Sequence, residues 1–293
     1  MITKARVIPY LQLARFPNIF TAVADVLAGY LIVTGFQIQW IALAGLMTAS
    51  SAVYAAGCVL NDYMDRGTDA LERPFRPIPS GRISPHRAFS IALILFSIGL
   101  FGASLAGPGP FWIASLLVVF VIGYDGWAKK QSVKGPLTMA LCRSTNLVLG
   151  MSPAFGQGGI HWIFPVITLA YVFGLTVLSR YEVSGGLGFR KWLILILWIL
   201  PLISLFGMNT LGVLRYPSLI YLGLLILWTG PVLGYGLFKV SPAYIGRAVK
   251  YLILGIPVLD AVYVSGIHGF AMGLLVVLCL VPAWLFSRFL YVT

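Results

Sequence analysis

Residues 40–69 read WIALAGLMTASSAVYAAGCVLNDYMDRGTD, an apolar stretch that ends in a run of polar and acidic residues. Trp40–Leu60 contains no charged residue. It is long enough to cross the ~30 Å hydrocarbon core of a bilayer, which takes ~20 helical residues. The stretch therefore predicts a transmembrane helix with a group of acidic residues where it reaches the membrane surface.

Nine further apolar segments follow the same pattern, each separated from the next by Gly, Pro or charged residues. Hydrophobic residues make up 59% of the 293 residues and charged residues 10%, a balance that excludes a water-soluble globular domain and a disordered chain. We expect an all-α, polytopic membrane helix bundle with nine to ten spans, forming one domain over residues 1–293. The predicted spans are Phe16–Gly35, Trp40–Leu60, Ala88–Leu105, Pro110–Ala128, Pro136–Phe155, His161–Leu178, Trp192–Gly207, Pro217–Phe238, Ile245–Ser265 and Phe270–Phe289.

The basic residues define an orientation for these spans. With ten spans, all of the 20 Lys and Arg residues except Arg143 and Arg215 fall on one side of the membrane. By the positive-inside rule that side is cytoplasmic. We expect a multi-pass protein of the cytoplasmic membrane with both termini in the cytoplasm. The net charge of +12 is explained mainly by this bias, and no basic run with interleaved aromatic residues indicates a nucleic-acid partner.

The acidic residues are few and clustered. Four of the eight lie between positions 62 and 72. If the second helix continues through the N-D-x-x-D-x-x-x-D pattern, its polar side chains share one face, because residues three and four apart are neighbours on a helix. Oxygen ligands grouped in this way suit a hard divalent cation. The residues of the pattern are Asn61, Asp62, Asp65 and Asp69.

The segment after this pattern, Arg73-Pro74-Phe75-Arg76-Pro77-Ile78-Pro79-Ser80-Gly81-Arg82, carries three arginines on a proline-rich backbone. Arginine forks match phosphate oxygens, and Mg²⁺ is usually held by a few carboxylates together with substrate phosphates. Carboxylates followed by arginines at a membrane surface therefore indicate a site for a metal ion and a diphosphate.

These two motifs resemble those of the UbiA superfamily of intramembrane prenyltransferases, over about the first 265 residues. The resemblance implies two four-helix halves followed by further helices, Mg²⁺ bound at Asn61, Asp62, Asp65 and Asp69, and arginines that steady the diphosphate of an isoprenoid donor. The family's second acidic motif is reduced here to Ser179-Arg180-Tyr181-Glu182-Val183-Ser184-Gly185-Gly186, with Glu182 as the one acid. This variant and the tenth span are similar to the EboC-like branch of the superfamily.

Further residues are candidates on weaker grounds. The family places a Lys four residues after a Tyr; here Tyr124 is followed at five residues by Lys129, with Lys130 and Lys134 as alternatives. Arg15-x-x-Asn18 and Arg143-x-x-Asn146 are a possible trace of the internal repeat, and Arg143 and Asn146 are placed either near a substrate head group or in a buried pair that ties helices together. Asp25 and Asp260 are isolated intramembrane acids, which are candidates by position.

The complete candidate site has three parts. We assign catalytic roles to Asp65, Asp69, Arg73, Lys129 and Glu182. Substrate contacts are assigned to Asn18, Asn61, Asp62, Arg76, Arg82, Tyr124, Lys134, Arg143 and Asn146. The expected Mg²⁺ ligands are Asn61, Asp62, Asp65, Asp69 and Glu182.

The sequence therefore predicts a Mg²⁺-dependent prenyltransferase whose partners are an isoprenyl diphosphate donor and a small cyclic acceptor. Two other classes stay open: a lipid-alcohol phosphotransferase, whose aspartate pattern differs from this one, and a non-catalytic isoprenoid-binding or transport protein. Transporters place coupling charges near the membrane midplane, whereas the acids here cluster at a surface.

Overall fold

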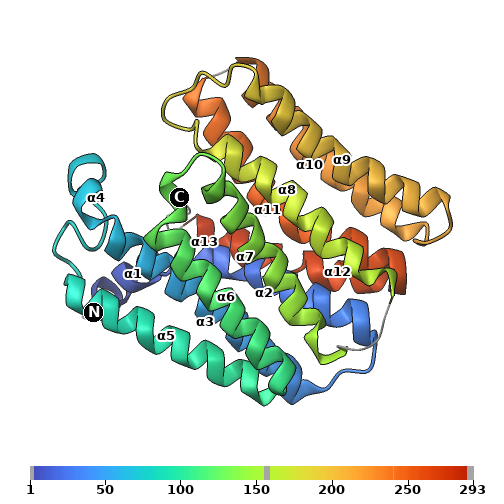
Figure 1. The fold of residues 1–293 in the computed structure, drawn as a ribbon, viewed down its shortest axis with the longest axis horizontal. Helices are drawn as coiled ribbons and strands as arrows, with labels where there is room; N and C mark the ends of the chain where they lie inside the picture. The colour runs from blue at the N-terminus through green and yellow to red at the C-terminus, as the bar shows by residue number, and fades with distance from the viewer. Residues whose placement is uncertain (1–2, 155–158, 240, 289–293) are drawn as a thin grey trace.

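The computed structural model describes residues 3–154, 159–239 and 241–288, and within these ranges the chain forms helices and no strand. The long helices lie side by side in one bundle (Figure 1). Their bounds are α1 Thr3–Leu13, α2 Phe16–Thr34, α3 Trp40–Met64, α4 Arg66–Glu72, α5 Pro85–Leu105, α6 Pro108–Gly126, α7 Lys134–Met151, α8 Ile163–Ser179, α9 Arg190–Thr210, α10 Pro217–Lys239, α11 Pro242–His268, α12 Phe270–Val277 and α13 Leu280–Ser287.

The predicted all-α membrane bundle is confirmed, and each of the ten predicted spans contains helix. In the part of the chain that the structure describes, eight helical segments are long and apolar enough to cross a membrane, the last being Phe270–Ser287 taken as one. The two remaining spans are α8, an apolar helix of 17 residues, and α7, whose buried residues include Arg143, Ser144, Thr145 and Asn146. A polar helix such as α7 is stable inside a membrane only where neighbouring helices surround it.

The buried side chains form two hydrophobic clusters. One is built mainly from α2, α3, α5 and α6, the other from α7 to α12. Helix α2 contributes to both, through Val26 and Tyr30 to the first and through Ala24, Ala28 and Leu31 to the second. Two clusters joined by α2 agree with two helical halves.

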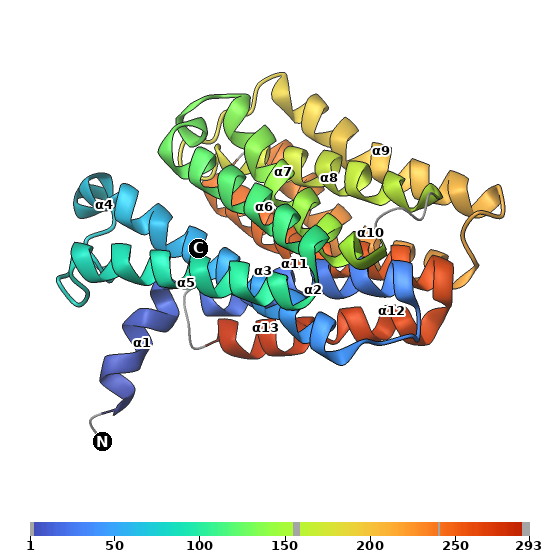
Figure 2. The ribbon, with the colours of Figure 1, turned by 60° about the horizontal axis from the view of Figure 1, so that its bottom comes forward.

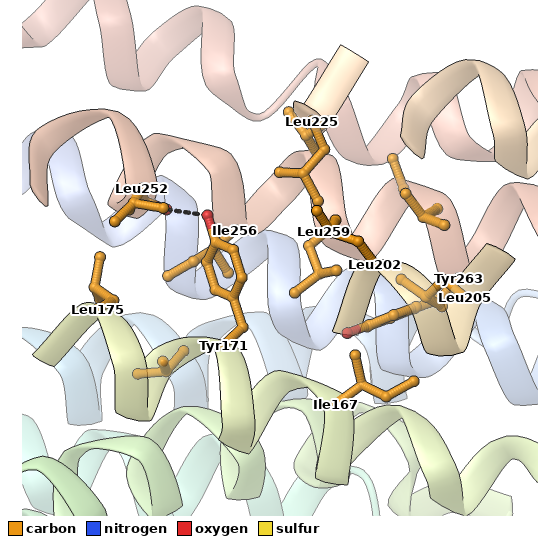
Figure 3. Packing of buried hydrophobic residues seen from close by; sticks show 14 of the residues in the cluster. Ile167, Tyr171, Leu175, Leu202, Leu205, Leu225, Leu252, Ile256, Leu259 and Tyr263 are labelled. Atoms are coloured by element: carbon orange, nitrogen blue, oxygen red, sulfur yellow. Dashed lines mark hydrogen bonds between the residues drawn. The ribbon is translucent and has the colours of Figure 1, made fainter. Parts of the chain in front are cut away.

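Aromatic residues of α8 and α11 pack within the second cluster (Figure 3). The Tyr171 hydroxyl donates to the Leu252 carbonyl at 3.0 Å. Tyr263 stacks on Phe164 with ring centroids 4.6 Å apart. The Tyr263 hydroxyl lies 3.1 Å from Thr168 Oγ1, so both of these buried tyrosines keep a hydrogen-bond partner for the hydroxyl group.

Glycines allow the closest helix contacts. A Cβ on Gly29 would lie 2.2 Å from the Leu147 carbonyl oxygen, and a Cβ on Gly150 would lie 2.2 Å from that of Val26. Helices α2 and α7 thus meet backbone to backbone at these two residues. Association of membrane helices depends on such close packing, because lipid tails are as apolar as the side chains they would release.

The C-terminal segment returns along the bundle to the end where α2 begins. Phe270 stacks on Tyr221 at the start of α10, with ring centroids 5.4 Å apart. Phe286 packs on Phe16 and Phe20, at 5.0 and 5.9 Å. The tenth predicted span therefore runs the length of α2, and its last predicted residue, Phe289, lies outside the described residues, as does Phe155.

The tenth span is interrupted between α12 and α13. Pro282, near the start of α13, has no backbone N–H to donate, and its ring excludes the carbonyl four residues earlier from the helix.

At the end of the bundle that holds α4, the short helix α1 projects away from the other helices (Figure 2).

Candidate functional site

The acidic motif lies at the junction of α3 and α4. Helix α3 extends past the predicted end through Asn61 and Asp62 and stops at Met64. Asp65 has φ −87° and ψ 0° and separates the two helices, so the helix does not continue uninterrupted through the pattern, which was the condition for a shared face. Its amide still donates to Asn61 O at 2.9 Å, and the Asp69 amide to Asp65 O at 2.8 Å. These two hydrogen bonds keep the backbone close to helical across Asp65, so the carboxylates stay near one another, although their side chains do not all converge on one point.

Arg76 joins two of the carboxylates. Its Nη1 lies 2.7 Å from Asp69 Oδ2 and 3.2 Å from Asp62 Oδ1. All three side chains are buried, with 8%, 5% and 7% of their surface exposed for Arg76, Asp69 and Asp62. The proline-rich segment thus folds back over the end of α3, as its arginines and the preceding carboxylates suggested.

A second cation, Lys129, follows α6. Its Nζ lies 2.7 Å from Asp65 Oδ1 and 3.9 Å from Asp125 Oδ1. Asp125 also accepts a hydrogen bond from Asn61 Nδ2 at 2.7 Å. Of the lysines considered from the sequence, Lys129 is the one that reaches the acidic motif, and Asp125 belongs to the same cluster.

Arg15, at the start of α2, is the third cation. Its Nη2 lies 3.4 Å from Asp62 Oδ1 and 3.5 Å from Asn61 Oδ1. Among the described residues it is the one non-glycine residue with a positive φ, 46°. Left-handed backbone is strained for a residue with a Cβ and persists where the surrounding structure requires it. Here it places the guanidinium group over the acidic motif.

A small cavity lies beside this group. It has a volume of about 90 Å³ and is lined by Gln12, Arg15, Asp62, Phe75, Arg76, Pro77 and Arg82. Arg82 is held by Gln12 Oε1 at 3.1 Å and by the carbonyl of Phe75. Three arginines around one cavity form a site whose charge and geometry suit a phosphate group.

The loop between α8 and α9 brings Glu182 towards the first half of the chain. Burial raises the pKa of the Glu182 carboxyl, and the nearby Arg73 guanidinium opposes this increase. Arg180 in the same loop donates to the carbonyl oxygens of Lys129 and Gln131 at 2.9 and 3.1 Å. Arg180 thus binds backbone carbonyl oxygens, and Arg73 is the guanidinium that lies near Glu182; the metal-binding role of Glu182 stays a prediction.

Other candidates lie at the edge of the cluster or away from it. Tyr124 is half-buried, with Arg15 and Arg180 among its charged neighbours. The exposed Lys134 places its Nζ 4.4 Å from the centre of the Trp127 ring. Asn18 forms a side-chain hydrogen bond with Tyr54. We find no contact of Lys134 with the acidic motif among the described residues.

Arg143 and Asn146 lie within α7 and bind α2. Arg143 donates to Asp25 Oδ2 at 2.9 Å and to Thr21 Oγ1 at 2.7 Å. Asn146 Nδ2 donates to Ala22 O at 2.8 Å and to Asp25 Oδ2 at 3.0 Å. This is the buried pair that ties helices together, one of the two alternatives that the sequence left open.

The proposed repeat of R-x-x-N has unequal positions in the structure. Arg15 precedes the first residue of α2, whereas Arg143 lies within α7, which begins at Lys134. The two copies therefore occupy different places along their helices, and the two hydrophobic clusters are the better evidence for two halves.

The donor atoms of the acidic motif fit a metal ion that is shared with a phosphate ligand. Within residues 3–154, 159–239 and 241–288, no three His, Cys, Asp or Glu side chains converge on a point where a metal could be held by protein alone. Instead, Asp62 and Asp69 share Arg76, and Asp65 and Asp125 share Lys129. A pair of carboxylates completed by phosphate oxygens is the arrangement usual for Mg²⁺.

Two members of the cluster were not assigned to the site from the sequence. In the sequence, Arg15 contributes only to the orientation and to the possible repeat, and Asp125, beside Tyr124, is explained equally well as a partner of the neighbouring lysines and as a ligand or base. The available signal was the position of both residues at helix ends on the same membrane side as the acidic motif.

Comparison with known proteins identifies relatives of the chain. The profile of the UbiA prenyltransferase family matches residues 22–241. A digeranylgeranylglyceryl phosphate synthase from Sulfurisphaera tokodaii is 33% identical over 177 residues, which are 60% of this chain and 62% of the relative. The synthase of the same name from Saccharolobus solfataricus is 30% identical over 245 residues, 74% of this chain and 82% of the relative. The chain thus spans about three fifths of the length of the first of these relatives.

Solved structures share the fold at low sequence identity. One, of a digeranylgeranylglyceryl phosphate synthase, superposes with a TM-score of 0.68 at 20% identity over 90% of this chain and 99% of the other. A UbiA homologue from Aeropyrum pernix gives 0.61 at 15% identity, over 94% and 98%. A UbiA homologue from Archaeoglobus fulgidus, bound to GPP and Mg²⁺, gives 0.53 at 16% identity, over 92% and 99%.

Proposed function

The chain belongs to the UbiA prenyltransferase family, and we propose on this basis that it transfers a prenyl group from an isoprenyl diphosphate to the hydroxyl group of a glyceryl phosphate lipid. The observation that carries the proposal is the grouping of Asp62, Asp65, Asp69 and Asp125 with Arg15, Arg76 and Lys129. The site faces the side of the membrane that we propose to be cytoplasmic.

The charges of this cluster suit a diphosphate that arrives with a metal ion. Four carboxylates meet three basic side chains, so one negative charge is in excess before any ligand binds. Phosphate oxygens of a bound diphosphate would replace carboxylates as the partners of Arg76 and Lys129, and the released carboxylates would be available to hold the metal ion. Mg²⁺, when bound, supplies positive charge that stabilises the departing diphosphate.

The residues proposed to hold Mg²⁺ are those predicted from the sequence. Asp62, Asp65 and Asp69 supply carboxylates, Asn61 an amide oxygen, and Glu182 a carboxylate from the opposite loop. The buried environment of Asp62 and Asp69 strengthens their electrostatic interactions relative to those in water. With one acid instead of two in its loop, Glu182 is expected to hold a second ion more weakly.

The reaction divides between the acidic cluster and the interior of the bundle. The bond between the allylic carbon and the diphosphate oxygen breaks, and its electrons leave with the diphosphate. The acceptor oxygen attacks the allylic carbon, and the hydroxyl proton is released. Arg15, Arg76 and Lys129 face the charge that develops on the leaving group, while the apolar helices exclude water that would otherwise capture the allylic cation.

The acceptor in this proposal differs from the one inferred from the sequence. The sequence suggested a small cyclic acceptor. The names of the relatives instead denote a glyceryl phosphate that carries two geranylgeranyl groups, which favours an acyclic lipid alcohol with one chain already attached. Arg82, which lines the same cavity as Arg15 and Arg76 and is not assigned to the leaving diphosphate, supplies positive charge for a phosphate of this kind. Assignment to the EboC-like branch stays a prediction.

The test uses the full chain in lipid nanodiscs with Mg²⁺ and radiolabelled geranylgeranyl diphosphate. Glyceryl phosphate bearing one geranylgeranyl group is offered in one reaction and a hydroxylated aromatic acid in another. We expect a doubly prenylated glyceryl phosphate, diphosphate release, and loss of both in Asp65→Ala. Tight donor binding without release in either reaction contradicts an enzyme and favours an isoprenoid-binding protein; product from the aromatic acid alone contradicts the lipid acceptor.

A further inference from the structure

Two acidic residues that are far apart in sequence meet inside the bundle. Asp25 lies in α2 and Asp260 in α11, both with 0% of their surface exposed. The Asp260 carboxyl lies within hydrogen-bonding reach of the Asp25 carboxyl. Two ionised carboxylates within hydrogen-bonding reach of each other repel one another unless a positive charge lies between them.

Most of the oxygen atoms around the Asp25 and Asp260 carboxyl groups have no hydrogen-bond donor. Asp25 Oδ2 accepts from Arg143 at 2.9 Å and from Asn146 at 3.0 Å. Asp25 Oδ1, both carboxyl oxygens of Asp260 and Asn146 Oδ1 are buried and have no hydrogen-bond partner. The four unpaired atoms are all acceptors, so the site lacks a cation or a proton and not an anion.

The charges around Asp25 and Asp260 show how much positive charge the site lacks. Arg143 supplies one positive charge against the two carboxyl groups. Among the described residues, the other titratable groups that interact with the pair or with Arg143 are neutral in their ordinary state: Tyr263 of α11, Cys279 between α12 and α13, and Tyr54 of α3 beside Arg143. A net charge inside a membrane is costly, so one further positive charge balances the site, and a divalent ion would overcompensate.

We propose that Asp25, Asp260 and Asn146 form a site for one monovalent cation, a proton or Na⁺, in the interior of the bundle. A proton on Asp260 would donate to Asp25 Oδ1, and Na⁺ would be coordinated by the same unpaired oxygens. The site is separate from the acidic motif at the end of α3. It joins α2, α7 and α11, and thereby connects the two hydrophobic clusters.

Thermal unfolding of the full chain in detergent tests this site. Wild type and Asp260→Asn are compared over a range of Na⁺ concentrations, with choline as the replacement cation, and infrared spectra are recorded for a protonated carboxyl band. A bound Na⁺ raises the Tm of the wild type, a chain of 293 residues, by about 2 °C for each tenfold increase in Na⁺ above its dissociation constant. Asp260→Asn removes the excess negative charge, so it is expected to be insensitive to Na⁺ and to lack the carboxyl band.

A proton and a Na⁺ ion give different results in the unfolding and infrared measurements. A carboxyl band present in wild type and absent from Asp260→Asn, without a Na⁺ effect, identifies a proton. A Na⁺ effect confined to wild type identifies sodium. Glu72→Gln removes one charge from an exposed residue and is expected to behave as wild type. If Asp260→Asn does not fold, Asp25→Asn replaces it. A wild type with neither the band nor the Na⁺ effect overturns the proposal.

Discussion

Replacement of Arg76 by alanine tests how the acidic motif is held together. Arg76 is 7% exposed and lies 2.7 Å from Asp69 and 3.2 Å from Asp62, both of which are also buried. Removing one partner of a buried ion pair leaves an uncompensated charge and typically costs about 3–5 kcal/mol. In Arg76→Ala two carboxylates lose their shared partner. We expect this loss in the free energy of unfolding, which for a chain of 293 residues corresponds to a decrease in Tm of about 5–8 °C.

Arg66→Ala is the matched control for this variant. Arg66 is exposed, donates to the Tyr63 carbonyl at 2.8 Å and stacks 4.5 Å from the centre of the Tyr63 ring. Contacts of an exposed arginine contribute about 1 kcal/mol or less. Thermal unfolding of both variants in the same detergent is therefore expected to separate them by several degrees.

Magnesium distinguishes a metal site from an ordinary structural ion pair. Without Arg76, Asp69 loses its partner and Asp62 keeps only Arg15 at 3.4 Å, so both carboxylates are more available to Mg²⁺. An ion at 100 times its dissociation constant stabilises the fold by about 2.7 kcal/mol. We expect Mg²⁺ to raise the Tm of Arg76→Ala more than that of wild type or Arg66→Ala. Equal stability of the two alanine variants, or an equal Mg²⁺ effect on all three proteins, would refute this account of the motif.

Three further predictions concern packing, the second loop and topology. Gly150→Ala places a Cβ about 2 Å from the Val26 carbonyl oxygen and is expected to lower stability by about 3 kcal/mol or more, whereas Gly223→Ala, which meets nothing within 4 Å, should be neutral in the same unfolding assay. Glu182→Gln is expected to raise the Mg²⁺ concentration for half-maximal turnover; an unchanged titration means that the second loop holds no metal. Because burial raises the pKa of Glu182, its carboxylate is lost at a higher pH than usual as pH falls, so wild type should require more Mg²⁺ in mild acid and the glutamine variant should lack this component. A cysteine at Ser287 should react with membrane-impermeant reagent from the cytoplasmic side; labelling from the opposite side would contradict the proposed orientation.

Much of the acidic site follows from sequence because its residues are local. Asp62, Asp65 and Asp69 lie within two helical turns, and the next arginine to contact them, Arg76, follows in the same loop. Local spacing therefore nearly fixes their relative positions. The break at Asp65 was not predicted, because the ending of a helix within a polar loop depends on the side chains that pack around it.

Contacts between residues far apart in the sequence were harder to predict. Arg15 and Lys129 reach the motif from α2 and from the end of α6, and hydropathy places these residues only near one membrane surface. It gives neither the rotation of each helix about its axis nor the order of helices in the bundle. For the same reason Arg143 could be assigned to the interior but not to Asp25.

The sequence by itself determined that the chain spans a membrane, where its helices lie along the sequence, and which loop carries most of the acidic chemistry, because apolar length and local spacing depend on neighbouring residues. The tertiary structure alone decided which cation serves each carboxylate and that Asp25 meets Asp260. These contacts join residues on different helices. The lipid surrounds every apolar helix alike, so side-chain packing between helices selects the neighbours.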